Sequence, residues 1–70
     1  MNKTVIEFHS CGSSGNIFYI IGMVQTVMRK EKRIQDYNEM WERVNSSKSY
    51  ENALKIIREY VTLIDLDGIY

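Results

Sequence analysis

The chain of 70 residues contains no proline, one cysteine and one histidine, and its nine basic side chains are balanced by nine acidic ones. A single cysteine cannot form a disulfide within the chain, so the sequence predicts a protein of the reducing cytoplasm. A formal net charge of zero gives no general attraction to nucleic acid or to an anionic membrane. We therefore expect neither as a partner, and any bound anion has to be recognised locally.

Long apolar runs are also missing. The most apolar segment, 17–28, has twelve residues, whereas a helix that crosses a bilayer needs about 20. The first ten residues contain Glu7 and His9 where a secretion signal would be apolar throughout. These absences predict a soluble protein that is not secreted.

The length of the chain sets a limit on its core. A chain of 70 residues forms one domain, 1–70, near the smallest size at which a single apolar core holds a fold without disulfides, metal or a partner subunit. We therefore expect the protein to associate with itself as a homo-oligomer.

The order of apolar residues predicts an α+β fold that is mostly helical. Residues 4–9 alternate apolar and polar side chains, as a half-buried strand does. Helical spacing predicts helices over 17–31 and 34–44, and a third that starts at Tyr50 behind a capping Ser49. Branched residues over 61–66 predict a short second strand beside the first.

The predicted helices have distinct apolar faces. The stripe of the first is expected to comprise Ile17, Ile20, Ile21, Val24 and Met28, widened by Phe18, Met23 and Val27. The face of the second is expected to comprise Ile34, Tyr37, Trp41 and Val44, with an ion pair between Glu39 and Arg43 one turn apart. One small sheet cannot cover so apolar a first helix, which favours burial against a second copy.

The segment HSCGSSGNIFYIIG, residues 9–22, contains the change from the first strand to the first helix. Small residues between a strand and a helix allow an anion to approach the unpaired N–H groups of the first helical turn. Gly12 and Gly15 favour a nest of positive φ angles, and Asn16 is suited to cap the helix. The predicted ligand-binding residues are Ser10, Cys11, Gly12, Ser13, Ser14, Gly15 and Asn16, with Tyr19 placed to stack on a base.

Other interpretations of this segment remain open. The small residues can simply form a tight turn. Cys11 in Cys-Gly-Ser-Ser is similar to the C-x-x-S of monothiol redox proteins, but the chain has no proline for their cis-proline loop. His9 and Cys11 do not complete a tetrahedral metal site, and no G-x-S-x-G motif surrounds the serines. We expect no metal, no cofactor and no enzymatic activity.

Four residues in this region carry a resemblance. Gly15, Asn16, Phe18 and Gly22 form the pattern G-N-x-F-x-x-x-G, which, with Glu59-Tyr60-Val61 near the end of the chain, resembles a group of very short phage and prophage proteins. The resemblance implies an inhibitor of host defence that acts in the cytoplasm of the host cell. Such inhibitors act by blocking a protein or by sequestering a nucleotide signal.

The sequence thus predicts a non-enzymatic homo-oligomer that sequesters a phosphate-bearing small ligand, such as a nucleotide or a cyclic oligonucleotide signal. The alternative is a protein that inhibits a host defence enzyme by docking an apolar or aromatic helix face on it. A nucleic-acid-binding module conflicts with the net charge of zero.

Overall fold

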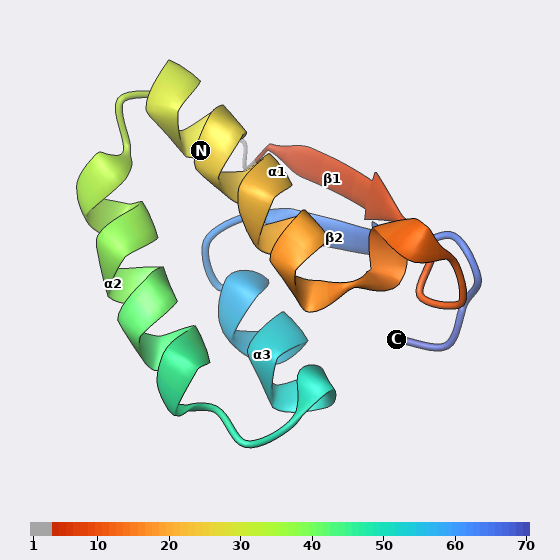
Figure 1. The fold of residues 1–70 in the computed structure, drawn as a ribbon. Coiled ribbons are helices and arrows are strands. Elements are labelled where there is room, and N and C mark those ends of the chain that lie inside the picture. The colour runs from red at the N-terminus through yellow and green to blue at the C-terminus, as the bar shows by residue number, and fades with distance from the viewer. Residues whose placement is uncertain (1–3) are drawn as a thin grey trace.

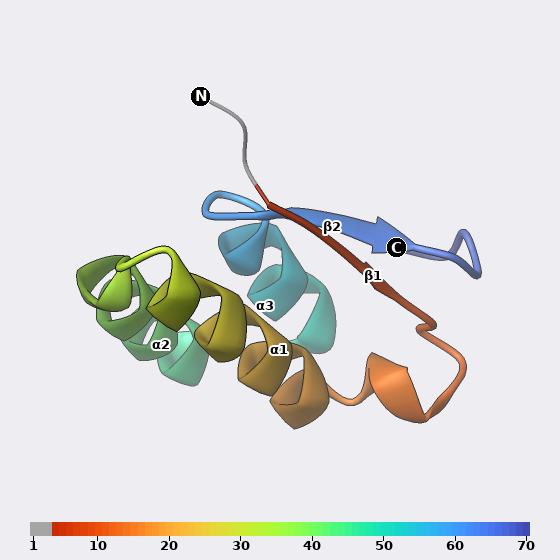
Figure 2. The ribbon, with the colours of Figure 1, turned by 90° about the horizontal axis from the view of Figure 1, so that it is seen from above.

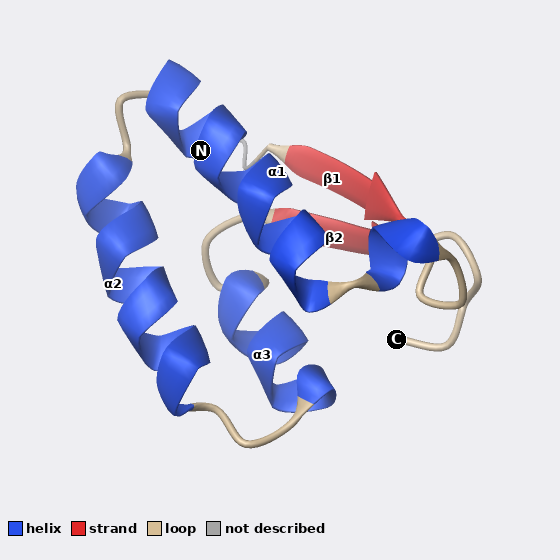
Figure 3. Cartoon of the chain, viewed as in Figure 1, coloured by secondary structure: helices blue, strands red, loops and turns tan. Residues whose placement is uncertain are grey.

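The computed structural model describes residues 4–70, and of Ser14 only the main chain. Helices and strands follow one another as the sequence predicts, which confirms the α+β class. Figures 1 and 3 show two short strands beside a layer of helices. The elements are β1 (Val5–Phe8), a 3-10 turn η1 (Ser13–Gly15), α1 (Ile17–Lys30), α2 (Ile34–Ser46), α3 (Tyr50–Ile57) and β2 (Thr62–Asp65).

β1 and β2 form a parallel two-stranded sheet in which Ile6 lies opposite Leu63. The predicted alternation of β1 is confirmed, because Ile6 and Phe8 are buried whereas Val5 and Glu7 are exposed. All three α-helices lie on the face of the sheet that carries the buried side chains, and in Figure 2 no element of residues 4–70 covers the other face. The sheet is therefore covered on one side by this chain.

The core lies between that face and the helices. The predicted stripe of α1 is confirmed, since Ile20, Ile21, Val24 and Met28 are buried and Ile17 packs against them. α3 contributes Ala53, Leu54 and Ile57, and the strands contribute Ile6, Phe8 and Leu63. Association of these apolar faces is the main force that holds so small a fold together.

α1 and α2 meet in a sharp turn. Lys32 has a φ of 58°, and the N–H of Arg33 donates to the carbonyl of Met28 at 2.7 Å. Helices commonly end with a residue in the left-handed region of backbone angles, followed by an N–H that donates to the carbonyl five residues earlier. α1 therefore ends at Lys30, one residue before the predicted boundary.

Two details of α2 differ from the prediction. Its fully buried apolar residue is Met40, while Ile34 remains 44% exposed. Arg43 pairs with Glu59 at 2.8 Å and not with Glu39, because folding brings the end of α3 alongside α2. Pairing between segments that are distant in sequence cannot be found from spacing within one helix.

Candidate functional site

The predicted site, residues 10–16, is called the junction below. It leads from β1 through η1 into α1. Asn16 caps α1 as predicted, since its side-chain oxygen accepts a hydrogen bond from the N–H of Phe18 at 2.8 Å. The N–H of Gly12 donates to the carbonyl of His9 at 3.0 Å, and that of Gly15 donates to the carbonyl of Gly12 at 3.0 Å. The junction thus satisfies several of its own amides.

Two carboxylates, one from the last residue of β2 and one from the turn after it, accept hydrogen bonds from the amides at the start of the junction. Asp65 accepts hydrogen bonds from the N–H of Ser10 at 3.1 Å and from its hydroxyl at 2.7 Å. Asp67 accepts from the N–H of Cys11 at 2.8 Å, and its other oxygen lies 3.1 Å from Nδ1 of His9. The negative charge at these donors comes from the chain itself.

These hydrogen bonds hold both carboxylates in their charged form. Desolvation raises the pKa of Asp65, but hydrogen bonds from the N–H of Tyr70 and from Ser10 outweigh it and hold the pKa well below its usual range. The N–H of Cys11, followed by His9, lowers the pKa of Asp67. The pair therefore ties the end of the chain to the junction through charge-assisted bonds.

The predicted nest of positive φ angles is wrong. Gly12 has a φ of −109°, and among residues 4–70 only Lys32 and Gly68 have a positive φ. The chain between Ser13 and Gly15 instead forms a right-handed 3-10 turn, whose amides point along the turn and not into a shared concavity.

Position 15 requires glycine for a different reason, which is that main-chain carbonyl groups approach it closely. A Cβ atom at this position would lie 2.5 Å from the carbonyl oxygen of Ser10 and 2.6 Å from that of His9. The Tyr50 hydroxyl donates to the carbonyl of Gly15 from the side of α3. Gly15, which is buried, is therefore held on one side by the carbonyls of His9 and Ser10 and on the other by Tyr50.

The predicted ligand-binding residues differ in their exposure to solvent. Tyr19 is 54% exposed, and Gly15 is buried. The side chain of Ser14 lies outside the described residues. Binding of a phosphate here stays a prediction, although the amides of Ser10 and Cys11 already have acceptors. The remaining residues are Ser10, which is half-buried, and Cys11, Gly12, Ser13 and Asn16, which are exposed.

Asp65 and Asp67 were not predicted as partners of the junction. A signal for them exists in the run Asp65-Leu66-Asp67-Gly68, which follows a strand and is typical of a side-chain-stabilised turn. Because parallel strands end at the same edge of a sheet, this turn lies beside the end of β1. Without knowing that the strands are parallel, the sequence does not indicate that proximity.

An apolar groove lies next to the junction, where the start of α1 meets the end of α2 and the start of α3. It has a volume of about 340 Å³. Phe18, at its rim, is 71% exposed, and Trp41 is half-buried in it. Lys48 is the one charged residue in its lining. The apolar lining comprises Ile17, Phe18, Ile21, Trp41, Val44 and Ala53.

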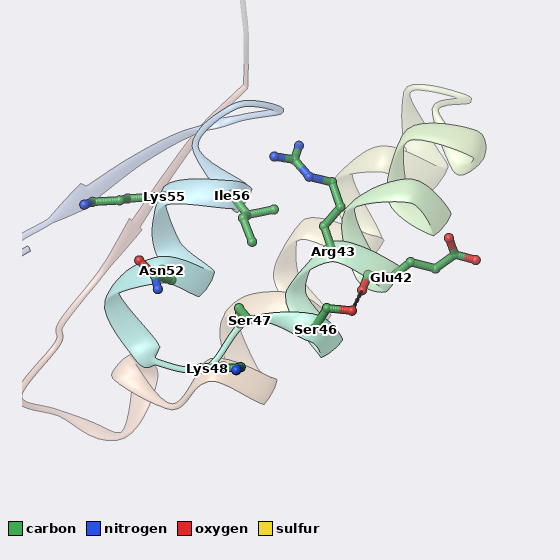
Figure 4. A pocket seen from close by; sticks show the side chains of 8 residues that line it. All are labelled: Glu42, Arg43, Ser46, Ser47, Lys48, Asn52, Lys55 and Ile56. Carbon is green, nitrogen blue, oxygen red and sulfur yellow. Dashed lines mark hydrogen bonds between the residues drawn. The ribbon is translucent and has the colours of Figure 1, made fainter.

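A larger polar cleft of about 730 Å³ separates α2 from α3 (Figure 4). Arg43 lines it, but its guanidinium is engaged by the carboxylate of Glu59, which raises the pKa of Arg43 further above its usual value. Figure 4 shows Glu42 and Lys55 pointing outward from opposite sides of the cleft. Its charged groups therefore do not converge on one point.

Residues 4–70 contain no group of three His, Cys, Asp or Glu side chains that could hold a metal ion. The helices in this range are also too short or too polar to cross a membrane. Comparison of the chain with protein-family models, with curated proteins and with solved structures found no match.

Proposed function

We propose that this chain is a non-enzymatic protein that binds another protein through the apolar groove between α1, α2 and α3. The observation that supports this best is Phe18, a large apolar side chain that is 71% exposed at the rim of a groove containing Trp41. Aromatic side chains next to an apolar hollow are typical of the residues that dominate binding energy at protein interfaces.

The chemistry of the groove defines its occupant. Its floor is apolar, and Lys48 stands at its rim among Asn45, Ser47 and Ser49. An amphipathic helix that inserts one or two apolar side chains and places a carboxylate near Lys48 matches this pattern. In the setting that the resemblance to phage proteins implies, the partner is a protein of host defence in the host cytoplasm.

Photocrosslinking at two neighbouring positions tests this proposal. Phe18 lies on the groove side of α1, whereas Tyr19 is also exposed but points away from the groove, one helical step of about 100° further round. A benzoylphenylalanine at position 18, in protein expressed in host cells, should give one stoichiometric adduct that the same label at position 19 does not give.

A second variant combines Trp41→Ala with the benzoylphenylalanine at position 18. It should abolish the adduct while circular dichroism shows an unchanged helix content. Equal adducts at both positions, or none at position 18, would contradict the proposal.

The predicted phosphate-bearing ligand is the second candidate. The polar cleft offers such a ligand Lys48, Lys55 and the amide of Asn52, whereas Arg43 in the same cleft is already held by Glu59. Calorimetric titration with mononucleotides and cyclic oligonucleotides tests it, with Lys55→Glu for the cleft, because Lys55 does not line the groove, and Ser13→Glu for the junction. Loss of binding in one variant locates the ligand, and no heat with any nucleotide would remove this candidate.

A further inference from the structure

The two edges of the sheet differ. The N–H of Thr62 donates to the carbonyl of Thr4 at 2.9 Å, and the N–H of Leu66 donates to that of Phe8 at 2.8 Å. Main-chain groups of successive residues in a strand point to opposite edges, so Thr4, Ile6 and Phe8 face β2. It follows that the N–H and carbonyl groups of Val5 and Glu7 point away from β2, and they are called the β1 edge.

The corresponding edge of β2 is covered by the chain itself. In β2, the main-chain N–H and carbonyl groups that point away from β1 are those of Leu63 and Asp65. The carbonyl of Leu63 accepts a hydrogen bond from Nε of Arg58 at 3.4 Å, and that of Asp65 accepts from the N–H of Gly68 at 3.1 Å. Arg58 also donates to the carbonyl of Tyr70 at 2.8 Å, which holds the end of the chain beside β2. No further strand can pair there without displacing these contacts.

The β1 edge has no such cover. Within residues 4–70, no group forms a hydrogen bond with the main chain of Val5 or Glu7. Figures 1 and 2 agree that no described element lies beyond β1 in the plane of the sheet. Unpaired edges of this kind pair with further strands, and parallel sheets are rarely left with an open edge and an open face together.

We infer that a second copy of the chain pairs with this edge, β1 against β1 in antiparallel orientation around a two-fold axis. The pairing produces a four-stranded sheet in the order β2-β1-β1-β2. Both outer edges of that sheet are β2 edges, which Arg58 and the end of the chain already cover. A second copy therefore leaves the sheet without an open edge, whereas a single added peptide would leave a new one.

The side chains favour one register. With the axis at Ile6, Val5 of each copy lies opposite Glu7 of the other, and each such pair exchanges two main-chain hydrogen bonds. With the axis at Glu7, two carboxylates would lie opposite each other, which is destabilising. That register would also pair Val5 with His9, whose carbonyl already accepts from Gly12. The Ile6-centred register is therefore the one expected.

α1 offers additional apolar surface on the same side of the molecule. Ile21 and Phe18 mark the flank of α1 that lines the groove near α2. Tyr19, Met23 and Val27 follow at helical spacing on the opposite flank, and Met23 and Val27 are only partly buried. Figure 1 shows the C-terminal part of α1 extending past β1, so this end of α1 lies near a chain that continues the sheet beyond β1.

Proline at position 7 tests the inference with little damage to the fold. The N–H of Glu7 points to the open edge, so Glu7→Pro removes donors needed only for pairing between copies and leaves the bonds between β1 and β2 in place. Glu7→Ala is the matched control, because it removes the same side chain and keeps the N–H. Thermal unfolding of both variants at one protein concentration verifies that they fold.

Sedimentation equilibrium from micromolar to millimolar protein should show a dimer for the wild type and for Glu7→Ala. Each dimer loses two hydrogen bonds in Glu7→Pro, so its dissociation constant should rise about tenfold to a hundredfold. A wild type that is monomeric throughout, or a folded Glu7→Pro variant that dimerises like Glu7→Ala, would overturn the inference. Protection of the Glu7 amide only when another protein is added would assign the edge to that protein instead.

Discussion

Asp65 and Ser10 are 55 positions apart in the sequence, yet the Asp65 carboxylate accepts hydrogen bonds from both the hydroxyl and the main-chain N–H of Ser10. The same carboxylate accepts from the N–H groups of Ile69 and Tyr70 at 2.9 and 2.8 Å. One side chain thus connects the start of the junction to the end of the chain. Loss of its charge weakens both connections at once.

Acid should destabilise the protein through this carboxylate. Because the pKa of Asp65 is lowered by folding, its contribution to stability is complete above its unfolded pKa of about 3.9 and is lost as the pH falls further toward the folded value. Asp65→Asn should therefore unfold at lower urea concentration than the wild type at pH 7. The difference between the two should shrink from about pH 4 downward.

The control for this experiment is Glu42→Gln, which removes an exposed carboxylate from α2 and should leave the urea midpoint near that of the wild type. A wild type and an Asp65→Asn variant with the same midpoint at pH 7 would show that the connection contributes nothing to stability.

Two glycines of the same chain should respond oppositely to alanine. Gly15→Ala places a methyl group against the carbonyl oxygens of His9 and Ser10, which belong to the main chain and cannot rotate away. We expect a loss of about 1–3 kcal/mol in the free energy of unfolding. Gly22→Ala, inside α1 with no atom within 4 Å of the added group, should instead gain about 0.5–1 kcal/mol. Urea unfolding measures both, and equal effects would contradict the close approach.

The Tyr50 hydroxyl should contribute to stability through the junction. Tyr50→Phe removes the donor to the carbonyl of buried Gly15 and should cost about 1 kcal/mol. Tyr19→Phe removes a hydroxyl from an exposed side chain and serves as the control, with no expected change. If both variants unfold at the same midpoint as the wild type, the bond to Gly15 does not stabilise the turn.

Arg58 should limit how many copies assemble. Arg58→Ala removes the donor to the carbonyl of Leu63 and releases the end of the chain from β2, so the second edge of the sheet opens. Light scattering should then show species larger than a dimer. Lys55→Ala, which removes an exposed cation from α3, the helix that ends just before Arg58, should leave the size of the wild type unchanged. An Arg58→Ala variant of wild-type size would show that another feature protects this edge.

Local features of the fold could be predicted well from the sequence. Alternation over residues 4–9 identifies the strand, Asn16 and Ser49 cap the helices that follow them, and the stripe of α1 lies in the core. Each of these depends on residues within a few positions of one another. Spacing along the chain is sufficient to determine them, because helix and strand geometry repeats over short distances.

The candidate site could be predicted only in part. Small residues between β1 and α1 indicated a turn, and the structure has one there, but the sequence did not indicate that Asp65 and Asp67 accept from the amides at its start. Likewise, Arg43 pairs with Glu59 and not with Glu39. The sequence did not reveal these partners, because a charged side chain takes the nearest partner in space, and a helical period does not indicate a partner from another element.

By itself, the sequence determined the class of the fold, the order of its elements and the faces that they bury, since these follow from periodicity and from the conformational preferences of individual residues. The tertiary structure decided that the strands are parallel and that Asp65 and Asp67 accept hydrogen bonds from the start of the junction. It also decided that, among residues 4–70, one edge of the sheet is covered and the other is not. These relationships arise between segments far apart in the chain, and only the packing of the whole core brings them together.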